Sequence, residues 1–264
     1  MFAGRRVVVV GGSSGLGRGI ATVAASEGAE LIVAARRLER LAEFVATARG
    51  ATALPLDLRD GASRTRFAAA VGEQLGQIDA LVFCSGAAPL RRFADTSDED
   101  WLSAIETNVI GVNQTIAALI GVLAPGSITV VVSSESVDEP RSHLGAYGAS
   151  KAALEHSMKQ WSEEYPWLRF TVVSLGATIP TEFGGGFGHD ELVDALNAWG
   201  ASGRNQAAFM DTTEVCTMLA RTIAALVDAP SIGMPRIVLR SPSPREADVD
   251  AVMGNVRESG MDTH

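Results

Sequence analysis

The chain has 264 residues, of which 47% are hydrophobic and 20% charged, a composition that suits one large globular domain. Its formal net charge of −9 argues against nucleic-acid binding, which requires a basic surface. No apolar run approaches the roughly 18 residues of a membrane span. The two Cys, Cys84 and Cys216, have neither disulfide nor metal-ligand spacing. We therefore expect a cytoplasmic protein that has no metal site and binds no nucleic acid or membrane.

Short apolar runs alternate along the chain with longer amphipathic segments. The runs predict strands at 6–10, 31–35, 51–56, 80–83, 127–132, 170–173 and 236–239. The amphipathic segments predict helices at 17–28, 38–49, 61–75, 97–119, about 146–165 and about 213–227, the fourth capped by Ser97. Because strands and helices alternate, we expect an α/β fold with a doubly wound, mostly seven-stranded parallel sheet and helices on both faces.

A glycine-rich turn, GGSSGLGRG at 11–19, follows the first predicted strand and opens the first predicted helix. Gly11, Gly15 and Gly17 would permit a tight turn and let backbone N–H groups approach a pyrophosphate at the helix N-terminus. A flexible turn is the alternative interpretation. The position at the start of a strand–helix–strand unit favours binding of a dinucleotide cofactor.

The end of the second predicted strand, AARR at 34–37, indicates which dinucleotide is preferred. Ala35 stands where an acidic residue would hold the ribose hydroxyls of NAD(H), whereas Arg36 and Arg37 suit the 2′-phosphate of NADP(H). We therefore expect NADP(H) to be preferred over NAD(H), mainly through Arg36. The alternative is that both arginines are surface residues beside a helix. Asp57, after the third strand, would bond the adenine edge or serve only as a turn residue.

The segment YGASK at 147–151 predicts acid–base chemistry. Lys151 is one of only two Lys in a chain that has twenty Arg, and it follows Tyr147, one of only two Tyr, by four residues. On a helix these side chains share one face. An ammonium beside a phenol lowers the phenol pKa toward neutrality, which makes Tyr a usable general acid and base. Ser134 closes a predicted strand shortly before, and Asn108 lies within the fourth predicted helix.

The glycine turn, Asp57, Asn108, Ser134 and YGASK, in this order, resemble the short-chain dehydrogenase/reductase family over residues 5–240. The resemblance implies a Rossmann fold and a reaction that moves a hydride between nicotinamide and a ketone or secondary alcohol. Tyr147 would exchange the proton, Lys151 would lower its pKa and hold the nicotinamide ribose, and Ser134 would bond the substrate oxygen. Asn108 would hold a water linked to Lys151, at a local break in its helix.

Further positions are assigned by the same resemblance. Cofactor contacts are expected at Gly11, Ser13, Ser14, Gly15, Leu16, Gly17, Arg36, Arg37, Asp57, Leu58, Ser85, Gly86, Tyr147, Lys151, Gly176, Ile179 and Thr181. The substrate pocket is expected to include Ser136, Leu144, Ala177 and Phe183. The domain would span 1–240 with a substrate lid at about 180–210, and residues 241–264 would form a polar tail. A homodimer or homotetramer is implied.

Some segments depart from the family pattern or leave alternatives open. Val10 replaces the usual Thr, and FCSG at 83–86 replaces N-N-A-G, which indicates apolar repacking with Cys84 as a small buried residue. Glu135, Asp138 and Glu139 form either a solvated acidic loop or a patch that favours a basic substrate group. The aromatic side chains at 183, 187, 199 and 209 either cover an apolar ligand or belong to the core.

Two other functions compete with a reductase or dehydrogenase. One is a cofactor-binding sensor that has lost catalysis, although the four catalytic residue types are all present. The other is a family member with non-redox chemistry, such as epimerisation or dehydration. Turnover with a carbonyl panel and a stoichiometric change in nicotinamide absorbance would separate these from the leading hypothesis.

Overall fold

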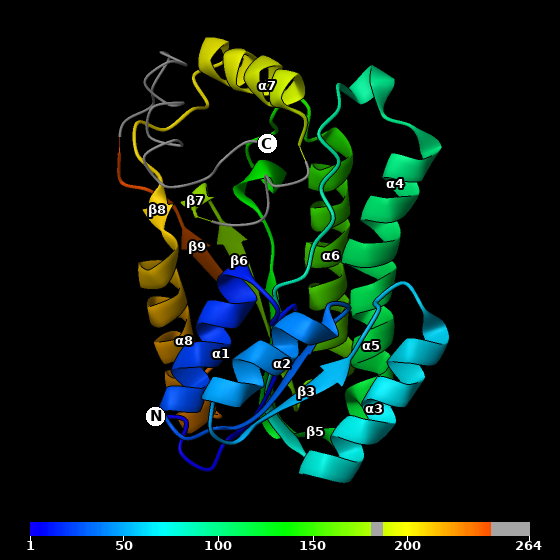
Figure 1. Cartoon of the computed structure of the whole chain (residues 1–264), viewed down its shortest axis with the longest axis vertical. Coiled ribbons are helices and arrows are strands. Elements are labelled where there is room, and N and C mark those ends of the chain that lie inside the picture. The colour runs from blue at the N-terminus through cyan, green and yellow to red at the C-terminus, as the bar shows by residue number, and fades with distance from the viewer. Residues whose placement is uncertain (181–186, 244–264) are drawn as a thin grey trace.

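A computed structural model describes residues 1–180 and 187–243 of the chain (Figure 1). Seven parallel strands form one sheet in the order β3-β2-β1-β4-β5-β6-β9. They are β1 (Arg6–Val10), β2 (Glu30–Ala35), β3 (Ala51–Pro55), β4 (Ile78–Phe83), β5 (Leu123–Val132), β6 (Arg169–Leu175) and β9 (Arg236–Leu239). The predicted seven-stranded, doubly wound parallel sheet is therefore confirmed.

Helices cover both faces of this sheet (Figure 1). They are α1 (Gly15–Ser26), α2 (Leu38–Thr47), α3 (Gly61–Leu75), α4 (Asp98–Ile105), α5 (Gly111–Leu119), α6 (Gly145–Glu164), α7 (His189–Ala201) and α8 (Thr212–Asp228). The helices α1, α2 and α8 pack on one face, and α3, α5 and α6 pack on the other. A short parallel pair, β7 (Thr178–Ile179) and β8 (Met210–Asp211), lies beyond the main sheet.

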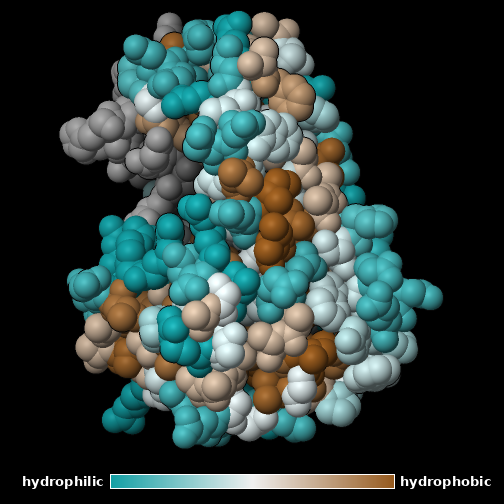
Figure 2. Space-filling view, turned by 90° about the vertical axis from the view of Figure 1, so that its right-hand side faces the viewer, coloured by the Kyte–Doolittle hydropathy of each residue, from teal (hydrophilic) through white to brown (hydrophobic). Residues whose placement is uncertain are grey.

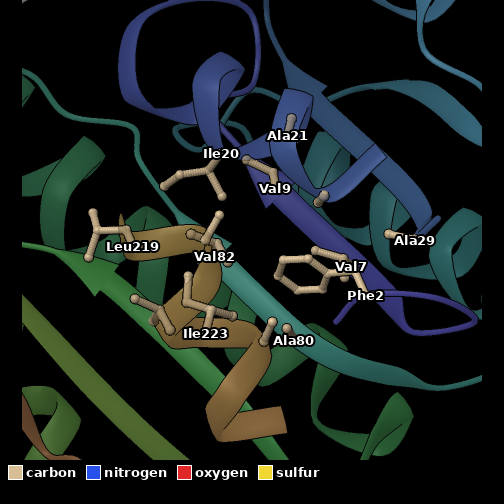
Figure 3. Close-up of a cluster of buried hydrophobic side chains, with 14 of the residues drawn as sticks. Phe2, Val7, Val9, Ile20, Ala21, Ala29, Ala80, Val82, Leu219 and Ile223 are labelled. Atoms are coloured by element: carbon tan, nitrogen blue, oxygen red, sulfur yellow. The ribbon is translucent and has the colours of Figure 1, made fainter. Parts of the chain in front are cut away.

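The four valines of β1 show why a continuous apolar run forms a central strand. Val7 and Val9 face the core under α1 and α8, whereas Val8 and Val10 face the core under α3, α5 and α6. Figure 3 shows the first of these cores, in which Ile20 of α1 lies near Val9 and Val82. Because successive side chains of a strand point to opposite faces, a strand buried on both sides needs an apolar residue at every position.

The fourth predicted helix is interrupted at the place where the family resemblance implied a break. Ser97 caps α4 through a capping box with Asp100, as predicted. A π-helical turn, Glu106–Ile110, then separates α4 from α5 and contains Asn108. Such turns are frequent at functional sites, because the extra residue lets the helix present a side chain that regular spacing would turn away.

Within the described residues, one helical segment is long and apolar enough to cross a membrane by length and composition. It runs from Asp98 to Val122, with a mean hydropathy of 1.2 in its best window. The sequence showed no single apolar run of that length, whereas the structure joins α4, the π turn and α5 into one continuous segment. In the fold, α4 packs on α6 and α5 packs on α3, so the segment forms part of the helical layer.

One helix was missed in the sequence analysis. The region predicted as a substrate lid contains α7, which lies above the carboxyl ends of the strands (Figure 1). Leu192, Ala195, Leu196 and Trp199 recur on one side of it, a periodicity that could have predicted the helix. The lid itself stays a prediction, because Thr181 and Phe183 lie outside the described residues. Most of the predicted polar tail, residues 244–264, also lies outside the described residues.

Arg169, at the start of β6, joins three parts of the fold. Its Nε donates to the Gly126 carbonyl at 2.9 Å. Its Nη1 donates to the carbonyls of Leu226, Ala229 and Ile232 at 2.6, 3.1 and 3.0 Å. These carbonyls belong to the start of β5, to the end of α8 and to the turn after it, so one side chain ties the three segments together.

Replacing Arg169 with Met should lower the free energy of unfolding by about 2–4 kcal/mol, because three part-buried carbonyls and one exposed carbonyl lose a charged donor together. Arg169→Lys should recover only part of this, since one ammonium cannot reach all the acceptors. Urea unfolding measures both changes. Arg5→Met serves as a control because the Arg5–Asp228 pair is 41% and 48% exposed and should contribute about 0–1 kcal/mol. An Arg169→Met protein as stable as that control would contradict the assignment.

Candidate active site

Tyr147 and Lys151 lie one turn apart on the buried face of α6. Their exposed fractions are 6% and 3%, and the Lys151 Nζ lies 5.7 Å from the centroid of the Tyr147 ring. The helix begins at Gly145, so both side chains lie in its first two turns, beside the end of β5. The predicted shared face is therefore confirmed, and this burial is unusual for a lysine.

Lys151 is held by the backbone at the end of β5. Its Nζ donates a hydrogen bond of 2.8 Å to the carbonyl of Val132. Burial lowers the pKa of Lys151 to about 8, and the nearby Glu155 carboxylate offsets part of that shift. An arginine could not respond in this way, because its guanidinium stays protonated.

The pKa of Tyr147 differs from the expectation. Burial raises the pKa of Tyr147 to about 12, while a hydrogen bond with Ser134 lowers it in part. The predicted depression by Lys151 is not found in this structure, because the ammonium is turned to the Val132 carbonyl and desolvation of the phenolate dominates. Tyr147 is accordingly a protonated phenol here, in the form that can donate a proton.

Ser134 joins the tyrosine to the loop that follows β5. It caps the short 3₁₀ helix Glu135–Val137, and its Oγ accepts hydrogen bonds from the backbone N and the Oγ of Ser136, at 3.1 and 2.9 Å. With its contact to Tyr147, the hydroxyl has three partners. The structure therefore brings Ser134, Tyr147 and Lys151 together, as the sequence indicated.

Asn108 is completely buried and connects the segment after β4 with α6. Its Oδ1 accepts from the backbone N of Ala87, and its Nδ2 donates to the Ala87 carbonyl and to the Ser150 Oγ, each at 2.8 Å. All these partners neighbour the site, since Ser150 precedes Lys151. The side chain thus fixes the position of the site, and the predicted water on Asn108 stays a prediction.

The glycine turn provides a cradle with little room for side chains. A Cβ on Gly17 would lie 2.2 Å from the carbonyl oxygen of Gly11, and Gly11 itself has a φ of +88°. The N-cap residue of α1, Ser14, makes no side-chain cap, so its hydroxyl leaves the first N–H groups of the helix uncapped. A Cβ on Gly86 would lie 3.6 Å from the Lys151 Nζ, which places this glycine between the cradle and the lysine.

Arg37, more than Arg36, extends over the glycine turn. Arg36 and Arg37 are both exposed, and the Nη2 of Arg37 donates to the Oγ atoms of Ser13 and Ser14 at 3.2 and 2.9 Å. A guanidinium beside uncapped helix N–H groups makes the turn suitable for a phosphate group. The residues present therefore fit a phosphorylated dinucleotide, with Arg37 in contact with the turn.

The other predicted cofactor residues have varied surroundings. The Asp57 Oδ1 accepts from the backbone N of Arg59, as a turn residue would. Leu58 is buried against Gly111, Ser85 lies against Gly11, Gly176 lies against Glu135, and Leu16 accepts a weak bond from Cys216. Ile179 belongs to β7, and Thr181 lies outside the described residues. Burial raises the pKa of the Cys84 thiol to about 12, which fits a small, inert residue.

Apolar side chains surround Tyr147 on the side of the predicted lid. The cluster consists of Ala88, Leu90, Leu144, Tyr147, Phe187, Leu192, Ala195 and Trp199. Trp199 also donates from Nε1 to the Ser142 carbonyl at 2.7 Å, which fastens α7 to the loop before α6. Of the predicted pocket residues, Leu144 belongs to this cluster, and Ala177 accepts from the backbone N of Met210. Phe183 lies outside the described residues.

A cavity of about 640 Å³ lies at the start of α6, away from the catalytic groups. Ser136 and Leu144 line it together with Phe93, Gly148 and Ala152, whereas Tyr147, Ser134 and Lys151 do not. The predicted pocket residue Ser136 therefore separates this cavity from Ser134, to which its hydroxyl is bonded.

The acidic loop is partly solvated, since Asp138 is exposed, but Glu135 is buried and arginines pair with all three carboxylates. Glu135 is 7% exposed and forms an ion pair with Arg141, whose side chain is equally buried. Asp138 pairs with Arg236, and Glu139 pairs with Arg240 at 2.7 Å. These partners come from β9 and from the loop itself. Most of these pairs join residues far apart in the sequence, so no local pattern predicts them. The acidic side chains of this loop are therefore paired and do not form a free patch that would select a basic substrate.

A model of the short chain dehydrogenase family matches residues 5–191, which contain the glycine turn, Asn108, Ser134, Tyr147 and Lys151. The chain belongs to the short-chain dehydrogenase/reductase family. As a short-chain dehydrogenase it is an oxidoreductase that uses a nicotinamide cofactor and acts on small molecules.

A curated reductase and a curated dehydrogenase show similarity over part of the chain. Glycine betaine reductase ATRR of Emericella nidulans is 32% identical over 185 residues, which cover 67% of this chain and 15% of the relative. The 2,3-dihydro-2,3-dihydroxybenzoate dehydrogenase of Bacillus subtilis is 30% identical over 184 residues, which cover 66% of this chain and 70% of the relative.

Solved structures of dehydrogenases share the fold over nearly the whole chain. An alcohol dehydrogenase from Thermococcus sibiricus, complexed with 5-hydroxy-NADP, has a TM-score of 0.78 at 23% identity and covers 91% of this chain and 98% of its own. A short chain dehydrogenase from Burkholderia cenocepacia, in complex with NADP, has a TM-score of 0.76 at 22% identity and covers 94% and 99%.

Proposed function

We propose that this protein is an NADP(H)-dependent cytoplasmic enzyme that interconverts an apolar ketone and its secondary alcohol, with Tyr147 as general acid and base. The observation that carries the proposal is the buried contact of Tyr147 with Ser134, beside Lys151 and inside an apolar cluster. An apolar wall favours an apolar substrate, because burying an unpaired polar group there would cost about 1–3 kcal/mol.

The chain's own groups have distinct roles in this proposal. The nicotinamide, when bound, supplies or accepts the hydride. Tyr147 donates its phenol proton to the substrate oxygen during reduction and takes it back during oxidation. Ser134 donates a hydrogen bond to the same oxygen, and Lys151 stabilises the phenolate that remains when its ammonium turns from the Val132 carbonyl toward Oη. The apolar cluster under α7 excludes water from these groups.

A carbonyl panel tests the proposal directly. Purified protein is mixed with NADPH and ketones of increasing apolar size, and loss of nicotinamide absorbance is compared with alcohol formed. We expect one alcohol per NADPH consumed and higher kcat/KM for apolar ketones than for polar ones of equal size. Nicotinamide binding without turnover of any ketone would favour the cofactor-binding sensor. Substrate conversion without net nicotinamide oxidation would favour the non-redox alternative.

The preference for NADP(H) is supported by the contacts of Arg37 with Ser13 and Ser14 and by the absence of an acid at Ala35. Arg37→Ala should weaken NADPH binding about 10–100-fold, because a charge-assisted phosphate contact is worth about 1.5–3 kcal/mol. NADH binding should change little. Fluorescence titration of both cofactors measures this, with Arg36→Ala in parallel and the exposed Arg49→Ala as the control. Equal affinity of the unmodified protein for the two cofactors would contradict the preference.

A homodimer built on the face of α4, α5 and α6 is part of the proposal. Leu102 and Ile110 are 56% and 46% exposed on this side, and Figure 2 shows apolar patches among its polar surface. The apolar helical segment Asp98–Val122 packs against the rest of the protein on its inner side only. A twofold partner would cover the outer side, and such dimers are the commonest soluble assemblies. Whether two dimers combine into a tetramer is left to the mass measurement.

Light scattering should give a dimer mass or a multiple of it at micromolar concentration. The double change Leu102→Glu and Ile110→Glu should give monomers, because it places four charges at a twofold interface. Leu38→Glu, which alters a 43% exposed apolar residue on α2, is the matched control and should keep the assembly. A monomer mass for the unmodified protein, or an unchanged mass for the double variant, would contradict this interface.

A further inference from the structure

Two successive turns of α6 are bonded to two successive residues at the end of β5. The Lys151 Nζ donates to the carbonyl of Val132 at 2.8 Å. One turn further along the helix, the Glu155 Oε1 accepts from the Oγ of Ser133, the next residue of the chain, at 2.6 Å. Ser133 is 2% exposed, and the Glu155 side chain is 12% exposed. Glu155 is therefore a largely buried carboxylate beside Lys151 that takes no part in the proton transfer described above.

Helix geometry directs the Glu155 carboxylate toward Lys151. Residues four apart share one face of a helix, and a helical side chain leans toward the N-terminus of its helix, which is the side on which Lys151 lies. The second carboxylate oxygen, Oε2, lies 4.0 Å from the Nη2 of Arg236 on β9, whose closer partner is Asp138. The short bond from Ser133 therefore holds the carboxylate at the end of β5, and the distant Arg236 neutralises it only in part.

The other titratable groups described around Lys151 are Tyr147, on the same helix, and Cys84, after the end of β4. Burial lowers the pKa of Lys151 to about 8, while Cys84 and Glu155 each raise it in part. Burial also raises the pKa of Cys84 and that of Tyr147 to about 12, so both groups are neutral in the range where Lys151 titrates. A neutral thiol cannot hold a cation in its charged form as an anion does, so Glu155 supplies the negative charge that faces the ammonium.

We infer that Glu155 is a positioning residue which keeps Lys151 protonated at working pH, by holding a fixed negative charge one helical turn behind the ammonium. This inference rests on the proposed function, in which a charged Lys151 stabilises the phenolate left on Tyr147. Burial alone favours the neutral amine, and a neutral amine would give the phenolate no ion-pair partner. Ser133 keeps the carboxylate in place, while the charge of Glu155 acts on Lys151.

Two variants separate the charge of Glu155 from its role in packing α6 on β5. Glu155→Gln removes the charge but keeps an amide oxygen that can accept from Ser133. Ser133→Ala removes the hydrogen bond but keeps the carboxylate on the same face as Lys151. If Glu155 only fastens the helix, Ser133→Ala should be the more harmful change. If its charge acts on Lys151, Glu155→Gln should be.

The kinetic test follows kcat against pH with NADPH and the best ketone of the panel. In Glu155→Gln the alkaline limb, where the ammonium is lost, should move about 0.5–1 unit to lower pH, because burial is no longer offset by the anion. At about pH 8.5 this lowers kcat about three- to fivefold, whereas at about pH 6 kcat and KM should stay within about twofold.

The other variants fix the meaning of that shift. Ser133→Ala should move the alkaline limb less than half as far, and Glu163→Gln, on the exposed side of the same helix, should leave it unchanged. Glu155→Asp keeps the charge on a shorter side chain and should give an intermediate shift, which also serves as the test if Glu155→Gln does not fold. An unmoved limb in Glu155→Gln, or an equal shift in Ser133→Ala, would overturn the inference.

A ligand-free titration separates this inference from the proposed function. The chain has two Lys, so in a Lys159→Arg background protein labelled with ¹³C at lysine Cε reports Lys151 alone. The midpoint of this signal, expected at the pKa of about 8, should fall by about 0.5–1 unit in Glu155→Gln and by less than half of that in Ser133→Ala. Failure of every ketone in the panel would refute the proposed function alone. An unmoved midpoint in Glu155→Gln would refute the role of Glu155 alone.

Discussion

Tyr147→Phe should reduce kcat about 10²–10⁴-fold, which is the usual contribution of a general acid–base group. The ring would keep its packing in the apolar cluster and only the hydroxyl would be lost. Because burial keeps the phenol of the unmodified protein protonated, with a pKa of about 12, the variant loses the proton that this hydroxyl would donate. NADPH affinity should stay within a few-fold, which a fluorescence titration measures beside the turnover assay.

Tyr165→Phe is the matched control for this substitution. It removes the only other tyrosine hydroxyl of the chain, at the end of α6 where the ring packs against Trp161 and Trp167. Its turnover should equal that of the unmodified protein. A Tyr147→Phe enzyme that retains most of its activity would remove the acid–base assignment and revive the sensor interpretation.

Lys151→Arg should lower kcat/KM about 10²-fold although the charge is conserved. The Lys151 Nζ is confined between the Val132 carbonyl at 2.8 Å and the surface of Gly86. A planar guanidinium is too wide for this space, and a displacement of about 1 Å near the reacting atoms can cost about 10²-fold. Lys159→Arg, on the exposed side of the same helix, is the control and should be silent. Steady-state kinetics of the two variants measure this difference in kcat/KM.

The same substitution should change how stability depends on pH. The folded pKa of Lys151 is about 8, below the ordinary 10.5, so the folded protein binds fewer protons than the unfolded chain between these values. The cost of burying the charged amine is therefore fully present below pH 8 and is relieved as pH rises from 8 to 10.5. Arg stays charged, so the Tm of unmodified protein minus that of Lys151→Arg should widen over this range. A constant difference would show that Lys151 is not buried as described.

The fold could be predicted largely because its signals are local. The four valines of β1 and the glycine turn after them identify a central strand and the helix that follows, without any long-range information. The helix α7 was not predicted because the glycines before it favour a loop, although its apolar positions recur at helical spacing. Local patterns indicate which elements exist. The strands β3 and β9 were weaker candidates, and their residues are half-buried or exposed.

The site was only partly predictable because its electrostatics depend on contacts between distant residues. Tyr147 and Lys151 are close in sequence, and helical spacing alone brings them together. The direction of the Tyr147 pKa shift was predicted wrongly, because the sequence shows which charge is near but not how deeply the phenol is buried. The Glu139–Arg240 pair spans 101 residues, so no local pattern could reveal it.

Isotope transfer is the measurement that tests the central claim most directly. NADPH carrying deuterium at nicotinamide C4, prepared separately on each face, is mixed with the protein and the best ketone of the panel, and the alcohol is analysed by mass spectrometry. The account predicts that one deuterium from one face appears at the carbinol carbon, with one NADP⁺ formed per alcohol, and that Tyr147→Phe forms almost none. Alcohol without deuterium from either face, or the same yield from Tyr147→Phe, would contradict it.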